Sequence, residues 1–225
     1  MTSAVAFFLL GSYLLGSIPF GLMIVRWLKG VDVRTVGSGN IGATNVTRVC
    51  GPAVGRFVFV LDLLKGLVPP LVGRLLLHLD RPDSRWIVLA AMLAVIGHNY
   101  SVFLRFQGGK GISTSGGALL GAAPLAGASA GIVFIVFTLL SSTISVGSLA
   151  AAASLPFLML WLYPHDWYQF AFGTAAALMA TYKHRKNIER LRAGTEPKVH
   201  IFGKRSPADP IIGSSQKDAT TDETG

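Results

Sequence analysis

The sequence predicts an all-α fold, a polytopic bundle of helices that span a membrane. Of the 225 residues, 51% are hydrophobic and only 14% are charged, whereas an ordinary soluble domain has about 25% charged residues. The mean hydropathy is +0.54, and the apolar residues gather in long runs. Because a helix needs about 20 apolar residues to cross the hydrocarbon core, these runs are long enough to span a membrane.

Seven runs have the length and hydropathy of a membrane span. They cover residues 4–26, 53–77, 86–104, 113–126, 128–145, 147–163 and 167–183. The first run lacks the preceding charges of a secretory signal, so we expect it to stay as a helix. The stretch 113–163 is ambiguous, because Pro124 and Gly147 could divide it into two long helices or three shorter ones.

The distribution of basic residues decides between these alternatives. With three helices in 113–163, the loops after the first, third and last spans share one side and carry most of the lysines and arginines. The other side then has only Arg81 and Arg85. The positive-inside rule therefore predicts a cytoplasmic C-terminus and an N-terminus outside. Because topology accounts for the net charge of +9, we expect no nucleic-acid partner.

The chain is expected to form one transmembrane domain over residues 1–205. From Ser206 onward, Pro, Ser, Asp, Thr and Gly dominate, which is the composition of a disordered tail. Residues 206–225 are therefore predicted to be a disordered cytoplasmic tail that carries no chemistry.

Three short segments rich in glycine, hydroxyl, amide and cationic groups interrupt the apolar runs on the predicted cytoplasmic side. Their polar and glycine residues include Ser38, Asn40, Thr44, Asn45 and Arg48, then Gly108, Gly109, Lys110 and Gly111, and finally His184, Asn187 and Glu196. Glycine lets backbone N–H groups approach an anion, and lysine or arginine supplies the countercharge. Together the three segments predict a phosphate site.

Each segment also has a simpler explanation. A turn or a helix cap would account for part of the first segment, but not for all its polar groups and glycines. The second segment could be a plain turn, although Lys110 favours an anion nest; its spacing is not that of a P-loop. The third could be only a basic juxtamembrane helix. Helical spacing nevertheless puts His184 and Asn187 on one face, and Glu196 could hold neighbouring arginines in place.

Asp62 and Lys65 are ionisable residues inside the second predicted span. Three residues apart on a helix, they share a face and can neutralise one another, whereas either alone would cost several kcal/mol in hydrocarbon. A structural role for the pair is favoured over a functional one. His98, near the end of another span, is likewise expected to be a hydrogen-bonded packing residue.

Some tempting patterns are interpreted as structural or accidental. His78 and Asp83 match the H-x-x-x-x-D spacing of a large acyltransferase class, but topology puts them on the side away from the three segments. The glycines between 116 and 131 are expected to serve close helix packing. The single Cys50 and the spacing of histidines and carboxylates predict no metal site or other cofactor.

At the three polar segments the sequence resembles the bacterial acyl-phosphate:glycerol-3-phosphate acyltransferase family, with three motifs in order between the first span and about Pro197. The resemblance implies a seven-helix protein of the cell inner membrane with its active site on the cytoplasmic face. The implied reaction transfers a fatty acyl group from acyl phosphate to the 1-hydroxyl of glycerol 3-phosphate, giving lysophosphatidic acid and phosphate, the first acylation of phospholipid synthesis. Membrane lipid and an upstream enzyme that forms acyl phosphate are implied partners, and no cofactor is implied.

The resemblance also implies roles for individual residues. Ser38, Arg48 and Lys110 are expected to hold glycerol 3-phosphate, and the expected pocket for the donor phosphate contains Thr44, Asn45, Gly108, Gly109 and Gly111. Asn40 is a further expected substrate-binding residue. His184 and Asn187 would complete the substrate site, with Ser38, Lys110 and His184 as the catalytic set and Glu196 as a structural residue. Because acyl phosphate has a good leaving group, positioning and charge neutralisation suffice without a dedicated base.

Two other functions stay open at the level of sequence. An anion or organophosphate transporter could use the same basic pocket, although transporters usually contain structural repeats that are not detected here. A non-catalytic lipid-binding scaffold is the second alternative. Phosphate release from acyl phosphate, dependent on glycerol 3-phosphate, would separate catalysis from both.

Overall fold

The computed structural model describes residues 3–76 and 84–198, and within these ranges the chain is helical with no strand. The helices are α1 (Ser3–Ser17), α2 (Phe20–Lys29), α3 (Ala43–Cys50), α4 (Pro52–Leu76), α5 (Ser84–Asn99), α6 (Ile112–Ala122), α7 (Pro124–Ser141), α8 (Ile144–Leu162), α9 (Trp167–Lys183) and α10 (Arg185–Arg192). Two 3-10 helices, η1 (Val33–Thr35) and η2 (Val102–Leu104), lie in connecting loops. His78, Asp83 and the predicted tail lie outside the described residues.

The predicted class, an all-α membrane protein, is confirmed. Within the described ranges four segments are long and apolar enough to cross a membrane, namely Ser3–Lys29, Arg85–Leu104, Pro124–Ser141 and Ile144–Leu162. Three of the other predicted spans correspond to α4, α6 and α9. Helix α4 carries four charged residues along its 25 residues, and α6 and α9 have 11 and 17 residues.

The first predicted span, 4–26, is not one continuous helix. Helix α1 ends at Ser17, and α2 begins at Phe20, because Pro19 between them has no N–H to continue the hydrogen-bond ladder. The carbonyl of Ile18 instead accepts a hydrogen bond from Lys65 Nζ of α4, at 2.7 Å. Gly21 then lets α2 pack closely on the loop before α3, since a Cβ there would collide with the Ile41 carbonyl oxygen. The break therefore sets the direction of α2 towards the first polar segment.

The ambiguous stretch 113–163 contains three helices, as the charge distribution predicts. The predicted boundaries differ from those of α6, α7 and α8 by up to four residues. The difference arises at Pro124, which was expected inside a span but begins α7. The first turn of a helix tolerates proline because its N–H groups lack intrahelical partners.

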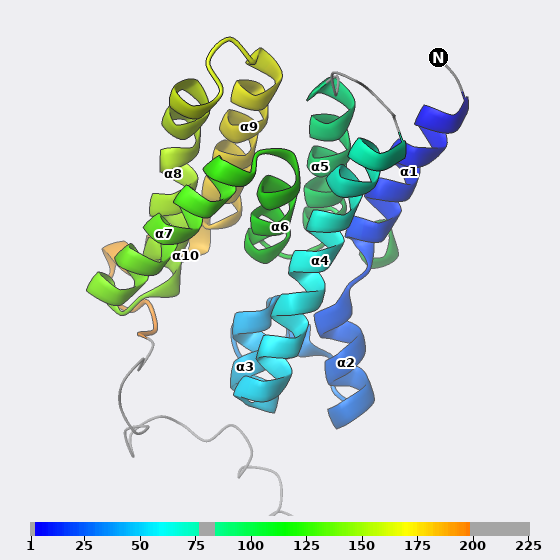
Figure 1. Cartoon of the computed structure of the whole chain (residues 1–225). Coiled ribbons are helices and arrows are strands. Elements are labelled where there is room, and N and C mark those ends of the chain that lie inside the picture. Colours follow the sequence, from blue (N-terminus) through cyan, green and yellow to red (C-terminus); the bar gives the residue numbers. More distant parts are fainter. Residues whose placement is uncertain (1–2, 77–83, 199–225) are drawn as a thin grey trace, which may run out of the picture.

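Helix α6 lies between two groups of helices, α7 to α9 on one side and α1, α4 and α5 on the other (Figure 1). Glycines allow the close approach of α4 and α6. A Cβ on Gly66 would collide with the Thr114 carbonyl oxygen, and one on Gly117 with that of Leu63. The predicted packing role is therefore correct for Gly117. With a rise of about 1.5 Å per residue, α6 is only ~16 Å long, about half the thickness of a hydrocarbon core.

Candidate functional site

The first polar segment is a loop between α2 and α3 that is shaped by the side chain of Asn45. Asn45 is almost fully buried at 1% exposure. Its Oδ1 accepts the backbone N–H of Ser38 at 2.8 Å, and its Nδ2 donates to the carbonyls of Val33, Val36 and Asn40 at 2.9–3.0 Å. Every polar atom of the side chain thus has partners inside the protein. Asn45 therefore shapes the loop, and its expected place in the donor-phosphate pocket stays a prediction.

The other polar and glycine residues of the first segment are more exposed than Asn45. Asn40 Oδ1 accepts the N–H of Gly42 at 2.8 Å, which closes the turn that begins α3. Gly37 and Gly39 have φ angles of 60° and 69°, a conformation that favours glycine. Ser38 and Thr44 are exposed, so their hydroxyl groups are accessible to a ligand.

The glycines of the second segment are packed against the end of α5. The N–H groups of Gly108 and Gly109 donate to the carbonyls of Asn99 and His98, at 3.2 and 3.0 Å. A Cβ on Gly109 would collide with His98 Nε2, and one on Gly111, at φ 76°, with Asn99 Oδ1. Both N–H groups are thus bonded within the protein, and the part of these glycines in the donor-phosphate pocket stays a prediction. These glycines hold the loop that carries Lys110.

Lys110 joins the second segment to the third. Its Nζ donates to Asn187 Oδ1 of α10 at 2.5 Å. Burial lowers the pKa of Lys110 to about 8, with Glu196 raising it and Arg190 and Arg48 lowering it further. The ammonium group is thus partly desolvated, which strengthens its interaction with an anion.

His184 occupies the junction between α9 and α10 and is buried at 2% exposure. Its Nδ1 lies 2.7 Å from the Ala180 carbonyl oxygen. Because a carbonyl can only accept, Nδ1 carries the proton, and Nε2 of the neutral ring has a lone pair. Burial lowers the pKa of His184 to about 4, the Ala180 carbonyl opposes this, and the charge of Lys110 adds to the lowering. The ring is therefore neutral at physiological pH.

Glu196 fixes the third segment through two hydrogen bonds. Its Oε1 accepts from Asn187 Nδ2 at 2.5 Å, and its Oε2 accepts from Arg190 Nε at 2.7 Å. Burial alone would raise the pKa of this carboxyl, but the bonds from Asn187 and Arg190 outweigh it and lower the pKa. The predictions that His184 and Asn187 share a face and that Glu196 holds a neighbouring arginine are consistent with this geometry, with Arg190 as the arginine.

Arg48 is the cation of the first segment on which the charges of this cluster act. Burial lowers the pKa of its guanidinium, and the charges of Glu196 and Arg190 also act on it, in opposite directions. The structure therefore brings together Arg48, Lys110, His184, Asn187 and Glu196 from the three segments. Sequence reasoning did not single out Arg190 among the basic residues of α10, because nothing in its spacing distinguishes it from Arg185 or Arg192.

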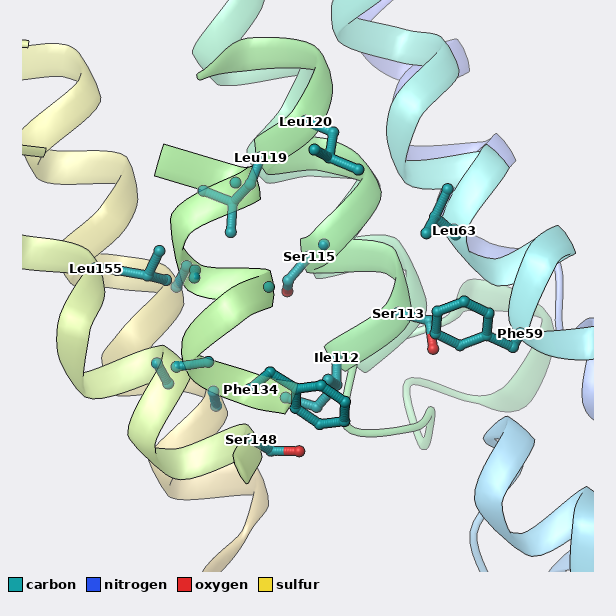
Figure 2. A pocket seen from close by; sticks show the side chains of 18 residues that line it. Phe59, Leu63, Ile112, Ser113, Ser115, Leu119, Leu120, Phe134, Ser148 and Leu155 are labelled. Atoms are coloured by element: carbon teal, nitrogen blue, oxygen red, sulfur yellow. The ribbon is translucent and has the colours of Figure 1, made fainter. Parts of the chain in front are cut away.

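An apolar cavity of about 200 Å³ begins next to this cluster. Helices α4, α6, α7, α8 and α9 line it, and Figure 2 shows Phe59, Leu63, Leu119, Phe134 and Leu155 around it. Ile112 and Ser113, directly after the glycine loop, belong to its wall, as does Ala180, whose carbonyl contacts His184. The cavity therefore extends from the polar cluster into the apolar part of the bundle.

Gly116 and Gly131 also line the cavity, and a Cβ on either would have no neighbour within 4 Å. For these two residues the predicted packing role is wrong, since no helix approaches them closely. Within the described ranges no group of three histidine, cysteine, aspartate or glutamate side chains could hold a metal ion.

A helical membrane protein with converging cationic and amide groups beside an apolar cavity is suited to an amphiphilic ligand, with an anionic head and an apolar tail. The chain belongs to the glycerol-3-phosphate acyltransferase family, whose model matches residues 6–194.

Curated relatives and solved structures agree with this membership. The chain is 45% identical to the glycerol-3-phosphate acyltransferase of Geotalea daltonii, over 87% of this chain and 97% of the relative. It is 43% identical to glycerol-3-phosphate acyltransferase 2 of Moorella thermoacetica, over 87% and 96%. The crystal structure of PlsY (YgiH), an integral membrane glycerol 3-phosphate acyltransferase in its glycerol 3-phosphate form, superimposes with a TM-score of 0.79 at 37% identity, covering 87% of this chain and 96% of that one. The lysophosphatidic acid form gives 0.77 at 36% identity, covering 87% and 95%.

Proposed function

We propose that this protein transfers a fatty acyl group from acyl phosphate to the 1-hydroxyl of glycerol 3-phosphate, giving lysophosphatidic acid and inorganic phosphate. The observation that carries the proposal is the connection of Lys110, Asn187, Glu196 and Arg190 by hydrogen bonds beside an apolar cavity. The relatives' names and the two ligand forms of PlsY support the same reaction.

The acyl phosphate binds along α6. The first N–H groups of a helix lack intrahelical partners and favour an anion, and α6 begins just after Lys110 and Gly111. The donor phosphate occupies this helix end, where Lys110 supplies positive charge. The acyl chain continues into the cavity, past Ile112 and towards Leu119 and Leu155. In this arrangement the first N–H groups of α6 take the role that sequence reasoning gave to Gly108 and Gly109.

Glycerol 3-phosphate binds on the side of the first segment. Arg48 and Lys110 neutralise its phosphate, and the exposed hydroxyl groups of Ser38 and Thr44 are hydrogen-bond partners for its polar groups. His184 accepts a hydrogen bond from the substrate at Nε2, because its Nδ1 proton is held by Ala180. The two cations separate two anions that would otherwise repel one another.

The acyl transfer proceeds without a dedicated protein base. The 1-hydroxyl oxygen forms a bond to the acyl carbonyl carbon, and the bond between that carbon and the phosphate oxygen breaks. The phosphate leaves with the bonding electrons and takes the hydroxyl proton on one of its oxygens. The protein contributes orientation and the stabilisation of negative charge by Lys110 and Arg48.

The proposed topology has seven crossings, with the N-terminus outside and the active site on the cytoplasmic face of a bacterial inner membrane. Consecutive long helices run in alternating directions, and α2, α3 and the end of α9 lie towards one end of the bundle (Figure 1). That end carries Lys29, Arg48, Lys110 and the basic residues of α10, as the positive-inside rule requires of a cytoplasmic face. The catalytic unit lies within residues 1–205.

A donor comparison on one purified preparation tests the proposed reaction. Phosphate release is measured with acyl phosphate or acyl-CoA, with and without glycerol 3-phosphate. We expect release only when acyl phosphate and glycerol 3-phosphate are both present, together with lysophosphatidic acid. Activity with acyl-CoA alone would contradict the donor assignment, and uptake of glycerol 3-phosphate into vesicles without any phosphate release would favour a transporter.

A further inference from the structure

Asp62, Lys65 and His98 form a cluster deep inside the bundle, an ion pair with a histidine beside it, that the proposed reaction does not use. Their exposed fractions are 2%, 2% and 4%. Lys65 Nζ lies 2.8 Å from Asp62 Oδ1, which confirms the predicted pair, and His98 Nδ1 lies 3.7 Å from the same oxygen. Asp62 Oδ1 and His98 Nδ1 have almost no accessible surface, and Lys65 Nζ contacts Asp62 and the Ile18 carbonyl, so any role of the three in the reaction must be indirect.

One side of the cluster contacts the helix break that directs the first polar segment. Lys65 donates to the Ile18 carbonyl at the junction of α1 and α2. Three residues further on, Gly21 packs α2 against Ile41 and Val46, in the loop before α3 and in α3 itself. The position of Lys65 therefore influences where the loop with Ser38 and the helix with Arg48 lie.

The other side of the cluster contacts the glycine loop. The His98 carbonyl accepts the N–H of Gly109, and the His98 ring lies so close that a Cβ on Gly109 would collide with Nε2. The other nitrogen of the His98 ring, Nδ1, faces the Asp62 carboxylate. Lys110 is the next residue after Gly109, so the ring orientation influences where the Lys110 side chain begins.

Stability alone does not account for this cluster. Taking ions out of water is expensive, and apolar residues of similar volume often stabilise a core at least as well as a buried ion pair. We propose that Asp62, Lys65 and His98 are positioning residues, which fix the glycine loop of Lys110 relative to the first polar segment. This inference rests on the proposed function, because it concerns the spacing of the two substrate-binding halves.

The test removes the ion pair without leaving one charge unpaired. The double variant Asp62→Leu with Lys65→Met keeps apolar side chains of similar length, and Gln169→Leu is the matched control. Gln169 is buried at 4% exposure and binds the Ala122 carbonyl at the other end of α6. Thermal unfolding, kcat and KM for acyl phosphate are measured for each purified variant.

We expect the double variant to lose about 100-fold in kcat, the scale reported for misplacing catalytic groups by an ångström. Its KM for acyl phosphate should change less than kcat, because the acyl chain still binds in the cavity. In a Lys110→Ala background the double variant should lower the residual rate no further, whereas the effect of Gln169→Leu should add to that of Lys110→Ala.

The variant His98→Phe is an independent test of the positioning role if the double variant does not fold. The phenyl ring keeps the packing against Gly109 and lacks both nitrogen atoms, so kcat should again fall by more than KM for acyl phosphate changes. Wild-type kcat in either folded variant, or an equal loss with and without Lys110, would overturn the positioning role. Failure of the wild-type protein to release phosphate would instead contradict the proposed function.

Discussion

Lys110 is a lysine whose charge can be lost within the working range of an enzyme. Burial lowers its pKa from 10.5 to about 8, with Glu196 raising the value and Arg190 and Arg48 lowering it. A lowered lysine pKa means that the ammonium form is complete well below pH 8 and is lost as the pH rises through 8. The substrate phosphates need this positive charge in the free enzyme.

We therefore expect kcat/KM for glycerol 3-phosphate to fall as the pH rises through about 8, since this ratio reports the pKa values of the free enzyme. Lys110→Arg keeps its charge at every accessible pH, because the guanidinium is effectively always protonated. The titration of the substrate affects both proteins equally, so it cancels when the wild-type kcat/KM at each pH is divided by that of the variant. An identical alkaline decline in both proteins would rule out Lys110 as its source.

Glu196 is expected to act on the reaction through Asn187 and Lys110. Glu196→Gln keeps the size of the side chain but weakens the charge-assisted bond to Arg190 and removes the charge that faces Lys110. Hydrogen bonds to charged groups contribute about 1.5–3 kcal/mol, so kcat/KM should fall by about 10- to 100-fold. The exposed Glu189, on α10, provides the control variant Glu189→Gln. Equal kcat/KM values for the two variants would show that the Glu196 carboxylate is dispensable.

Single residues show how far sequence reasoning reaches at this scale. Lys110, His184 and Asn187 were found because cations, amides and glycines cluster in short segments. The role of Asn45 could not be predicted, since its partners are backbone carbonyls whose positions depend on the folded loop. Likewise the glycines at 108 and 109 have the sequence pattern of an anion nest, but in the structure their N–H groups donate to carbonyls at the end of α5.

At the scale of elements, the proposed binding of the acyl chain along α6 predicts that the cavity limits which chains fit. Gly131 of α7 lines the cavity, with no atom within 4 Å of a Cβ added there. Gly131→Leu should fill part of the space and raise KM for long-chain acyl phosphates more than for short ones. Loss of about two buried methylenes, at ~0.8 kcal/mol each, corresponds to about a tenfold change.

The matched control for this prediction is Gly11→Leu. Gly11 is also a helical glycine with no atom within 4 Å of an added Cβ, but it is exposed on α1 and does not line the cavity. KM is measured for two donor lengths with each variant. A change in chain-length preference that is equal in both variants would show that the cavity does not hold the acyl chain.

Hydropathy predicted the apolar runs that fold as α1 and as α4 to α9, whereas it did not predict α2 as a separate helix, α3, or the helix ends and breaks. Charge distribution correctly favoured three helices in 113–163, because the third polar segment would otherwise be separated from the other two. The break at Pro19 was missed, since the run from 4 to 26 is apolar throughout and proline inside a span need not interrupt it. Here Lys65 donates a hydrogen bond to the Ile18 carbonyl, which the break leaves without its helical partner. The two residues are 47 positions apart, so hydropathy does not reveal this contact.

At the scale of the whole molecule, the proposed topology predicts which residues face each side of the membrane. In a Cys50→Ser background, single cysteines at Lys186 and Pro164 are treated with a membrane-impermeant thiol reagent in intact spheroplasts. Labelling is expected at position 164 only, with position 186 labelled after the membrane is opened. The reverse pattern would invert the topology and place the cationic cluster outside.

The short helix α6 also has a consequence for the fate of the product. Extracting an acyl chain from a bilayer costs about 0.8 kcal/mol per methylene, a large barrier for a chain of ordinary length. In the proposed topology α6 begins near the membrane surface and, at its length, ends roughly halfway through the hydrocarbon layer, so the proposed position of the acyl chain is at the depth where lipid tails already lie. Newly made lysophosphatidic acid can then slide sideways into the surrounding leaflet, so a water-soluble acceptor becomes a membrane lipid without its tail ever meeting water.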